Sequence, residues 1–304
     1  MKLQKKQTIS GSESLTSMED LLSRVPVRSK SKTKEINICI NYDYEFFPFT
    51  TASYLEFAAE RMLRVHMYRK DQIKGLKIDL VINVMPCSKI LKLPGVPSCY
   101  WEIDCHLVQG KEIDYYDAVD KVFIAQSPFL HLYPAGKTSY LPLACDPERH
   151  RPFPEEKKEY DIGFIGNDTY PKRRRLLDQL ETKYKVLRTN TKPGVPFSKE
   201  LSKCKLAFNC SMNYDVNMRF FEALAIGRLL VTDFLPAQVE FAKEGIHYVP
   251  FVDWEDLDNE VGYYLKNEKE RENMARAGSV YVRRHHTYAD RLRKILEVMG
   301  WTGF

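Results

Sequence analysis

The sequence lacks the patterns that would place it among disulfide-rich, zinc-binding or membrane proteins. Its seven cysteines contain no CxxC pair and are odd in number, which argues against a zinc site or a closed disulfide framework. Several of them lie inside apolar runs, as expected for buried thiols in a reducing compartment. No apolar run approaches the roughly 20 residues of a membrane-spanning helix, and the N-terminus lacks the apolar core of a secretory signal. We therefore expect a soluble, cytoplasmic protein.

Glycine-rich phosphate loops and metal-ligand clusters are scarce as well. The segment 41–47 (NYDYEFF) contains no glycine, so a dinucleotide-dependent oxidoreductase is not expected. The loop at 163–175 (GFIGNDTYPKRRR) matches neither GxGxxG nor the GK[ST] end of a P-loop. His285 and His286 are adjacent but have no acidic cage, and the DYE sequence at 43–45 resembles a metal-binding DxD motif only loosely. The sequence predicts no metal site and no resident cofactor.

The net charge of +5 lies in one part of the chain. Residues 1–34 carry eight Lys or Arg and three Asp or Glu, whereas the rest holds 38 residues of each sign. The first 34 residues are rich in Ser, Thr and Lys and poor in large apolar groups, so we expect a disordered basic tail. A neutral body argues against strong affinity for duplex nucleic acid.

From Glu35 onward, short apolar runs alternate with stretches of helical spacing. This alternation predicts parallel sheets with right-handed crossovers, and 304 residues suffice for two such α/β domains. A proline-rich, charged segment at 140–160 is typical of a linker between them. We expect strands within 35–43, 77–86, 96–106, 118–126, 160–168, 185–190, 204–211, 228–234 and 245–252. We expect helices within 50–68, 127–136, 171–184, 197–204, 215–226, 253–285 and 288–300.

The segment 209–233 (NCSMNYDVNMRFFEALAIGRLLVTD) combines a strand end, a turn and a helix start. The helix is expected to begin near Asp215 or Val216, and its exposed N–H groups would form an anion site. Arg219 lies in its first turns, and Glu222 follows three residues later on the same face. The pair suits contacts with a diphosphate and with ribose hydroxyls. On the residues alone, an ordinary ion pair on the helix surface is the favoured explanation of the same two residues.

Several short motifs, in order, resemble one family of glycosyltransferases. The segment 219–233 (RFFEALAIGRLLVTD) is similar to the donor-site signature of enzymes with the GT-B architecture, two Rossmann-like domains facing a central cleft. Other segments resemble the CgeB-like group, named after the spore maturation protein CgeB. The matching segments, which together span about 100–292, are YWEIDCH, YLPLACDPERHRP, YDIGFIGN, RFFEALAIG and HHTYADR.

The resemblance implies a nucleotide-sugar site in the C-terminal half. It implies donor contacts for Gly166, Arg219 and Glu222, with the diphosphate near the helix start at Asn217 and the ribose near Glu222. Further donor-side candidates in or beside the same loops are Asn167, Arg173, Ser211 and Thr232. Many retaining relatives carry a second glutamate eight positions before the matching Glu; Tyr214 stands there in this chain, followed by Asp215. The stereochemical outcome therefore remains open.

Candidates for the general base lie in the N-terminal half. Glu102, Asp104 and His106 cluster at the end of an expected strand, where a carboxylate or an imidazole can take a proton from an acceptor hydroxyl. Asp104 aligns with the aspartate of the family's tryptophan-then-aspartate motif, which makes it our first choice. A helix cap for Asp104 and a structural role for His106 are the alternatives. Asp43, after the first strand, is a further candidate.

Aromatic residues Tyr42, Phe46 and Phe47 surround Asp43. They suit a platform on which a sugar ring stacks, and they suit the hydrophobic core equally well.

The expected organisation follows from the resemblance. It comprises the tail at 1–34, a Rossmann-like acceptor-side domain at 35–152, a Rossmann-like donor domain at 153–280, and a C-terminal helix at 281–304 that packs back on the N-terminal domain. The expected activity is that of a metal-independent, hexosyltransferase-type glycosyltransferase with a UDP-sugar donor. The acceptor would be a hydroxyl of a glycan, a small molecule, a protein or a modified DNA base. A non-catalytic nucleotide-sugar-binding protein and a phage-type DNA-base glycosyltransferase are the alternatives.

Overall fold

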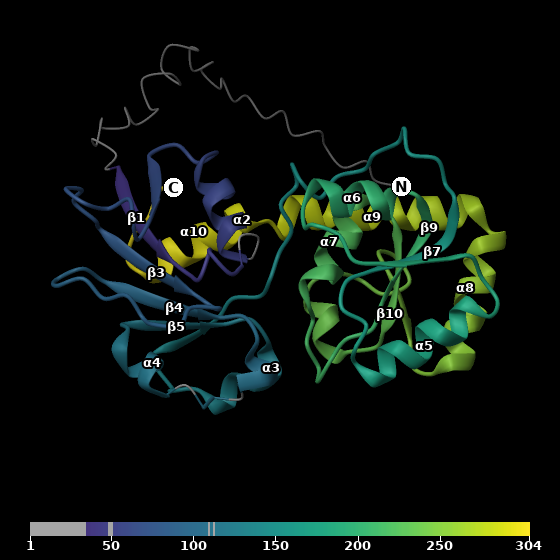
Figure 1. Ribbon diagram of the computed structural model, residues 1–304, viewed down its shortest axis with the longest axis horizontal. Helices are drawn as coiled ribbons and strands as arrows, with labels where there is room; N and C mark the ends of the chain where they lie inside the picture. The colour runs from purple at the N-terminus through teal and green to yellow at the C-terminus, as the bar shows by residue number, and fades with distance from the viewer. Residues whose placement is uncertain (1–34, 48–50, 109, 112) are drawn as a thin grey trace, which may run out of the picture. The chain divides into compact units, whose positions relative to one another are not determined.

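The computed structural model describes residues 35–47, 51–108, 110–111 and 113–304 (Figure 1). The basic tail expected at 1–34 lies outside the described residues. No helix in the described ranges is both long enough and apolar enough to cross a membrane. All seven cysteines lie in the described residues, are buried and form no disulfide.

The first half of the chain forms a parallel sheet of six strands in the order β2-β1-β3-β4-β5-β6. Strands β3 and β4 are buried along their whole length, which fits their mostly apolar sequences. Because the strands are parallel, their carboxyl ends lie along one edge of the sheet, where ligands of such sheets bind. The strands are β1 (Ile36–Asn41), β2 (Val65–Arg69), β3 (Leu80–Val84), β4 (Ser98–Glu102), β5 (Lys121–Ile124) and β6 (Thr138–Tyr140).

The second half forms a parallel sheet of five strands in the order β11-β10-β9-β7-β8. The two sheets and their helical crossovers confirm the α/β class that the alternating pattern predicts. The strands are β7 (Tyr160–Ile165), β8 (Val186–Thr189), β9 (Cys204–Asn209), β10 (Leu229–Asp233) and β11 (Val249–Phe251).

Helices connect the strands and cover both sheets. In the first half they are α2 (Thr51–Ala59), α3 (Cys105–Val108), α4 (Ile113–Ala118) and the 3₁₀ helix η1 (Ser127–Leu132). In the second half they are α5 (Pro171–Glu181), α6 (Val195–Ser202), α7 (Met218–Ile226), the 3₁₀ helix η2 (Pro236–Glu240), α8 (Trp254–Lys266), α9 (Glu268–His285) and α10 (Tyr288–Val298).

The helix expected over 50–68 is too long. Helix α2 ends at Ala59, and the last part of the segment forms β2, an edge strand paired with β1. Arg64 has φ +68° immediately before β2, a left-handed conformation that a continuing helix does not contain. The apolar residues of this segment suit either period, so tertiary pairing with β1 decides the outcome.

Helix α10 packs against α2, far from it in sequence (Figure 1). Tyr288, its first residue, stacks on Tyr54 of α2 with ring centroids 5.1 Å apart. Just before α10, the chain runs beside the segment that enters the second half: the Cys145 N–H donates to the His286 carbonyl, and the Tyr288 N–H donates to the Cys145 carbonyl. The end of the chain is therefore part of the first half's core.

Candidate functional site

The end of strand β7 is shaped around the side chain of Arg219. Its Nε donates to the Ile165 carbonyl at 2.8 Å, its Nη1 donates to Asn209 Oδ1 at 3.1 Å, and its guanidinium lies 4.6 Å from the centre of the Phe164 ring. Gly166 has φ +141°, and a Cβ at this position would overlap Arg219 Nη2. Glycine is therefore required here for two reasons, backbone conformation and space.

Arg219 carries a positive charge that no carboxylate neutralises directly. Among the described residues, no Asp or Glu forms an ion pair with it. Burial, followed by the nearby charge of Arg173, lowers the pKa of Arg219 to about 10, so the guanidinium stays protonated at neutral pH. The charges of Glu222 and Asp215 act on it from a greater distance, so a ligand that supplies a negative charge in direct contact would stabilise this partly buried cation further.

Helix α7 begins at Met218, later than the predicted start at 215–216. Asn213 and Tyr214 have positive φ angles, 49° and 64°, and this turn delays the helix. The N-cap residue is Asn217, whose side chain makes no capping hydrogen bond. Its Oδ1 is buried and has no partner in the part of the chain that the structure describes. The helix start therefore presents uncapped N–H groups beside Arg219.

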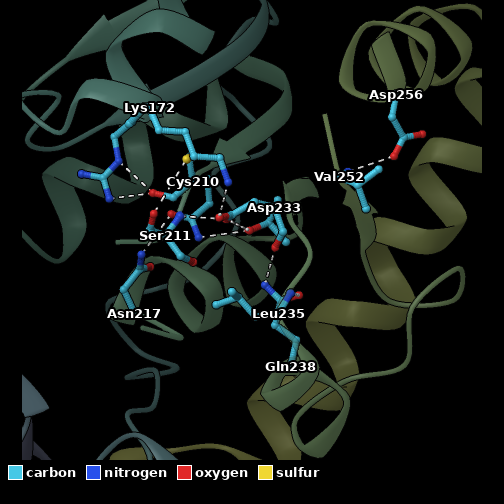
Figure 2. Close-up of polar contacts among 12 residues, drawn as sticks. Lys172, Cys210, Ser211, Asn217, Asp233, Leu235, Gln238, Val252 and Asp256 are labelled. Carbon is cyan, nitrogen blue, oxygen red and sulfur yellow. Dashed lines mark hydrogen bonds and ion pairs between the residues drawn. The ribbon is translucent and has the colours of Figure 1, made fainter. Parts of the chain in front are cut away.

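Ser211 and Asp233 join the ends of β9 and β10 (Figure 2). The Ser211 N–H donates to Asp233 Oδ1 at 2.7 Å, and Lys172 Nζ lies 3.4 Å from Asp233 Oδ2. Ser211 Oγ is buried and meets no hydrogen-bond partner within the described ranges. Thr232 is fully buried beneath them, where its hydroxyl accepts from Asn209 Nδ2. The Ser211 hydroxyl thus lies at this edge of the sheet, and Thr232 lies in the interior, where it contacts Asn209.

Arg173 holds the backbone around the site. Its Nε and Nη2 both donate to the Cys210 carbonyl, at 2.8 and 2.6 Å, and its Nη1 donates to the Asn167 carbonyl. The exposed Asn167 accepts the Thr169 N–H through Oδ1, which fixes the turn after β7. The rest of the Lys172–Arg175 run is more exposed, as expected for a helix surface.

Glu222 is buried within a polar cluster. Its Oε1 lies 3.2 Å from His150 Nε2, which is 3.1 Å from the Tyr54 hydroxyl. The Asp146 N–H donates to His150 Nδ1, so Nε2 carries the proton of a neutral ring. Glu222 therefore contacts a histidine from the linker, and no ion pair with Arg219 of the kind considered from the sequence exists among the described residues.

Asp215 is a second buried acidic residue, and it contacts a residue of the first half. Gln126 follows β5 and donates through Nε2 to the Ile103 carbonyl at 2.8 Å and to Asp215 Oδ1 at 2.7 Å. Burial, then the charge of Asp104, raises the pKa of Asp215 to about 8. Burial also raises the pKa of Asp104. Asp104 and Asp215, from different halves, are therefore electrostatic neighbours.

The remaining N-terminal candidates lie at the same sheet edge. Asp104 precedes α3, where its carbonyl accepts the Leu107 N–H, so it also occupies the position of a helix cap. His106 is 3% exposed, and burial lowers its pKa to about 4, so its ring is neutral at neutral pH. Asp43 Oδ1 accepts a hydrogen bond from Ser88 Oγ at 3.2 Å.

The sequence did not single out Gln126, His150 or Asp233. Gln126 meets Asp215 across 89 positions of the chain, and His150 meets Glu222 through the linker, so no local spacing could pair them. Asp233 is the last residue of the apolar strand β10, and a polar residue at a strand end is the sequence feature that could have identified it as a site residue.

Phosphate-binding features and carboxylates thus converge at the sheet edges. Arg219 and the α7 start can hold a diphosphate, and Asp104 can accept a proton. Ser211 and Asn217 each have a buried side-chain oxygen without a hydrogen-bond partner among the described residues. Within the described ranges, no group of three or more His, Cys, Asp or Glu could hold a metal ion.

Residues 150–297 match the model of the family described as Glycosyl transferase-like. The match spans just under half of the chain and includes every donor-side candidate. None of the curated proteins compared with the chain matches it. The finer resemblance to the CgeB-like group stays a prediction.

Several solved structures share the fold at low identity. An α-glucosyltransferase in complex with UDP and a 13-mer DNA containing an HMU base is 10% identical, with 87% of this chain and 99% of that chain covered and a TM-score of 0.66. HepE from Anabaena, in complex with UDP and glucose, is 9% identical, with coverages of 87% and 99% and a TM-score of 0.60. TarM is 12% identical with a TM-score of 0.56; the aligned region covers 73% of this chain and only 54% of TarM. The fold is therefore α/β with two parallel sheets, as in GT-B glycosyltransferases.

Proposed function

We propose that the protein is a glycosyltransferase that moves a hexose from a UDP-sugar to an acceptor hydroxyl. The observation that carries the proposal is Arg219, a protonated guanidinium next to the start of α7 that lacks an ion-pair partner among the described residues. Cations and helix N-termini are the groups that stabilise a leaving diphosphate. Neighbours with the same fold were solved with UDP, which supports this nucleotide.

The proposed reaction breaks the bond between the anomeric carbon and the phosphate oxygen of the donor. The acceptor oxygen bonds to the anomeric carbon, and its proton passes to a carboxylate. Asp104 suits this role because burial raises its pKa, and a base is most effective when its pKa lies closer to the working pH. Arg219 and the α7 N–H groups hold the negative charge of the departing UDP. These protein groups suffice for the charge balance without a resident cofactor.

Glu222 is proposed to contact the ribose of the donor. Its carboxylate is close to His150 on one side, and the carboxylate can still accept hydrogen bonds from hydroxyl groups. A cytoplasmic location is proposed because the buried cysteines form no disulfide.

The test is binding of UDP to the full-length protein. UDP should raise the melting temperature, because a ligand that binds only the folded state stabilises it. Glu222→Ala should weaken UDP binding in calorimetry, whatever sugar the donor carries. Tyr263→Ala, which removes an exposed aromatic ring on α8, is the control. Failure of UDP to bind the folded protein would refute the proposed function, and an unchanged affinity in a folded Glu222→Ala variant would remove Glu222 from the site.

The alternative of a non-catalytic nucleotide-sugar-binding protein makes a different demand. It needs Arg219 and the α7 start but no base. Substitution of Asp104 distinguishes the two functions, because it should greatly slow turnover by an enzyme but leave nucleotide-sugar binding by a non-catalytic protein unchanged.

A further inference from the structure

A small pocket opens at the carboxyl ends of β1 and β3. It has a volume of about 190 Å³ and is lined by Asp43, Tyr44, Glu45, Phe46, Lys70 and Ser88, above the buried Tyr42. Pockets for drug-sized ligands span roughly 300–1,000 Å³, so this one has room for a small group only. It is separate from the donor-side residues described above.

The pocket and the proposed base lie along the same edge of the first sheet. In the sheet, β3 pairs with β1 on one side and with β4 on the other, and Asp104 follows β4. Two strand spacings, roughly 10 Å, therefore separate the end of β1 from the end of β4. Thr51, at the start of α2, contacts the sulfur of Met218, the first residue of α7, at 3.7 Å. Helix α2, which follows the pocket residues in the chain, thus contacts the donor helix.

Most of the pocket's wall is held in place by protein contacts. The Asp43 N–H donates to the Pro86 carbonyl at 2.9 Å, and the Asp43 carbonyl accepts from the Phe46 N–H at 3.1 Å. Ser88 Oγ donates to Asp43 Oδ1, and the Arg69 guanidinium lies 5.0 Å from the centre of the Tyr44 ring. The carboxylate and the aromatic ring are therefore preorganised.

The chemistry of the wall combines aromatic surface with hydrogen-bond acceptors. The Phe46 side chain is 77% exposed, although burial is the usual state of a phenylalanine. Asp43 and Glu45 add carboxylate oxygens, and Lys70 adds one donor. An apolar ring face beside polar acceptors matches a pyranose, which has an apolar C–H face and a rim of hydroxyl groups.

The charge of the surroundings disfavours a polyanion. Asp71 adds a third acidic side chain near the pocket, besides Asp43 and Glu45. The pKa of the Tyr44 hydroxyl is raised first by desolvation and then by the negative charge of Asp71. Arg69 is held by Glu56 through two hydrogen bonds of 2.7 and 3.0 Å. A nucleic acid backbone requires an excess of Lys and Arg, and this pocket has an excess of carboxylates.

We propose that this pocket binds the acceptor and that the acceptor is a neutral saccharide. The proposal rests on the glycosyltransferase function proposed above and names the acceptor class for it. Phe46 stacks on the sugar ring, and Asp43 with Glu45 accepts hydrogen bonds from hydroxyls adjacent to the one that is glycosylated. The reactive hydroxyl then points along the sheet edge toward Asp104.

Saturation-transfer NMR on the full-length protein tests the proposal. The probes are the methyl glycosides of glucose, galactose and N-acetylglucosamine, measured with and without UDP. At least one should receive saturation on its ring protons. Phe46→Ala should weaken that binding about threefold to tenfold, the loss of one aromatic contact. Tyr263→Ala, a matched removal of an exposed ring elsewhere, should leave it unchanged.

Three outcomes would overturn the proposal. The first is that none of the saccharides binds, and the second is that Phe46→Ala and the wild-type protein bind the saccharide equally well. The third is that a 13-mer duplex containing an HMU base binds and that Phe46→Ala does not weaken this binding. The melting shift with UDP is measured in the same samples. A UDP shift without saccharide binding rejects the acceptor proposal alone, and loss of the UDP shift rejects the proposed function.

Discussion

Gln126 Nε2 donates a hydrogen bond of 2.7 Å to Asp215 Oδ1 and so joins the end of β5 to the turn before α7. The same nitrogen also donates a hydrogen bond to the carbonyl of Ile103, the residue before Asp104. Gln126 Oε1 is buried and has no partner among the residues described by the structure. One amide thus ties the Asp215 carboxylate to the backbone next to Asp104, and its own oxygen accepts no hydrogen bond from the described residues.

Asp215 should make the stability of the protein depend on pH. Burial, then Asp104, raises its pKa to about 8, so the folded state keeps a proton that the unfolded state releases above its ordinary pKa of 3.8. Wild-type stability should therefore fall as pH rises between these two values, by up to about 1.4 kcal/mol per pH unit. Asp215→Asn removes this dependence.

Urea unfolding of both proteins between about pH 5 and pH 7 measures the effect. The free energy of unfolding of Asp215→Asn relative to wild type should increase with pH, because only wild type loses stability through this group. A difference that stays constant across the range would show that Asp215 titrates normally.

Substitution of the proposed base should slow turnover without weakening the donor. Asp104→Asn keeps the shape of the side chain but cannot take a proton at neutral pH. We expect kcat to fall by about 10²–10⁴, the usual contribution of a general base, with UDP affinity nearly unchanged. Near-normal kcat in a stable Asp104→Asn protein would place the base elsewhere, and His106 and Asp43 would be the next substitutions.

The close approach of Gly166 and Arg219 gives a steric test of the phosphate site. In Gly166→Ala the new methyl group overlaps Arg219 Nη2, so the guanidinium must leave its position and UDP binding should weaken. Gly75→Ala is the matched control, since Gly75 also has a positive φ, +80°, but nothing within 4 Å of the added Cβ. Calorimetry compares the two. Equal UDP affinity in both folded variants would exclude Arg219 as a phosphate ligand.

Catalysis should not depend on a divalent cation. The motivation is that Arg219 and the α7 start already offer positive charge to the leaving diphosphate. Turnover in excess EDTA should therefore stay near its full rate. Loss of activity on chelation, with recovery on addition of Mg²⁺ or Mn²⁺, would contradict this expectation.

The sequence predicts the strands with long apolar runs well and the local geometry of the site less well. Strands such as β3 and β9 are recognisable because nearly every residue is buried and most of the residues are apolar. Strand β2 was missed because its alternating residues also fit a helix, and only pairing with β1 distinguishes the two.

Individual site residues were predictable where a strand end or a helix start marks them. Arg219 and Gly166 follow from such positions, but their steric dependence on each other requires three-dimensional structure. Helix α7 starts later than expected because Asn213 and Tyr214 adopt positive φ, which neither residue type requires. The burial of Asp215 and its bond to Gln126 depend on contacts between distant segments.

The position of α10 has a consequence for how the chain is made. Tyr288, Leu292, Ile295 and Leu296 complete the same apolar cluster as β1 and α2, and Tyr288 packs on Tyr54 and Trp101. Proteins are synthesised from the N-terminus, and N-terminal domains usually fold first. Here the core of the first half lacks these side chains until α10 has been synthesised. The five strands of the second half, which end with β11 at Phe251, all precede α10 in synthesis, so the first half is begun first and completed last.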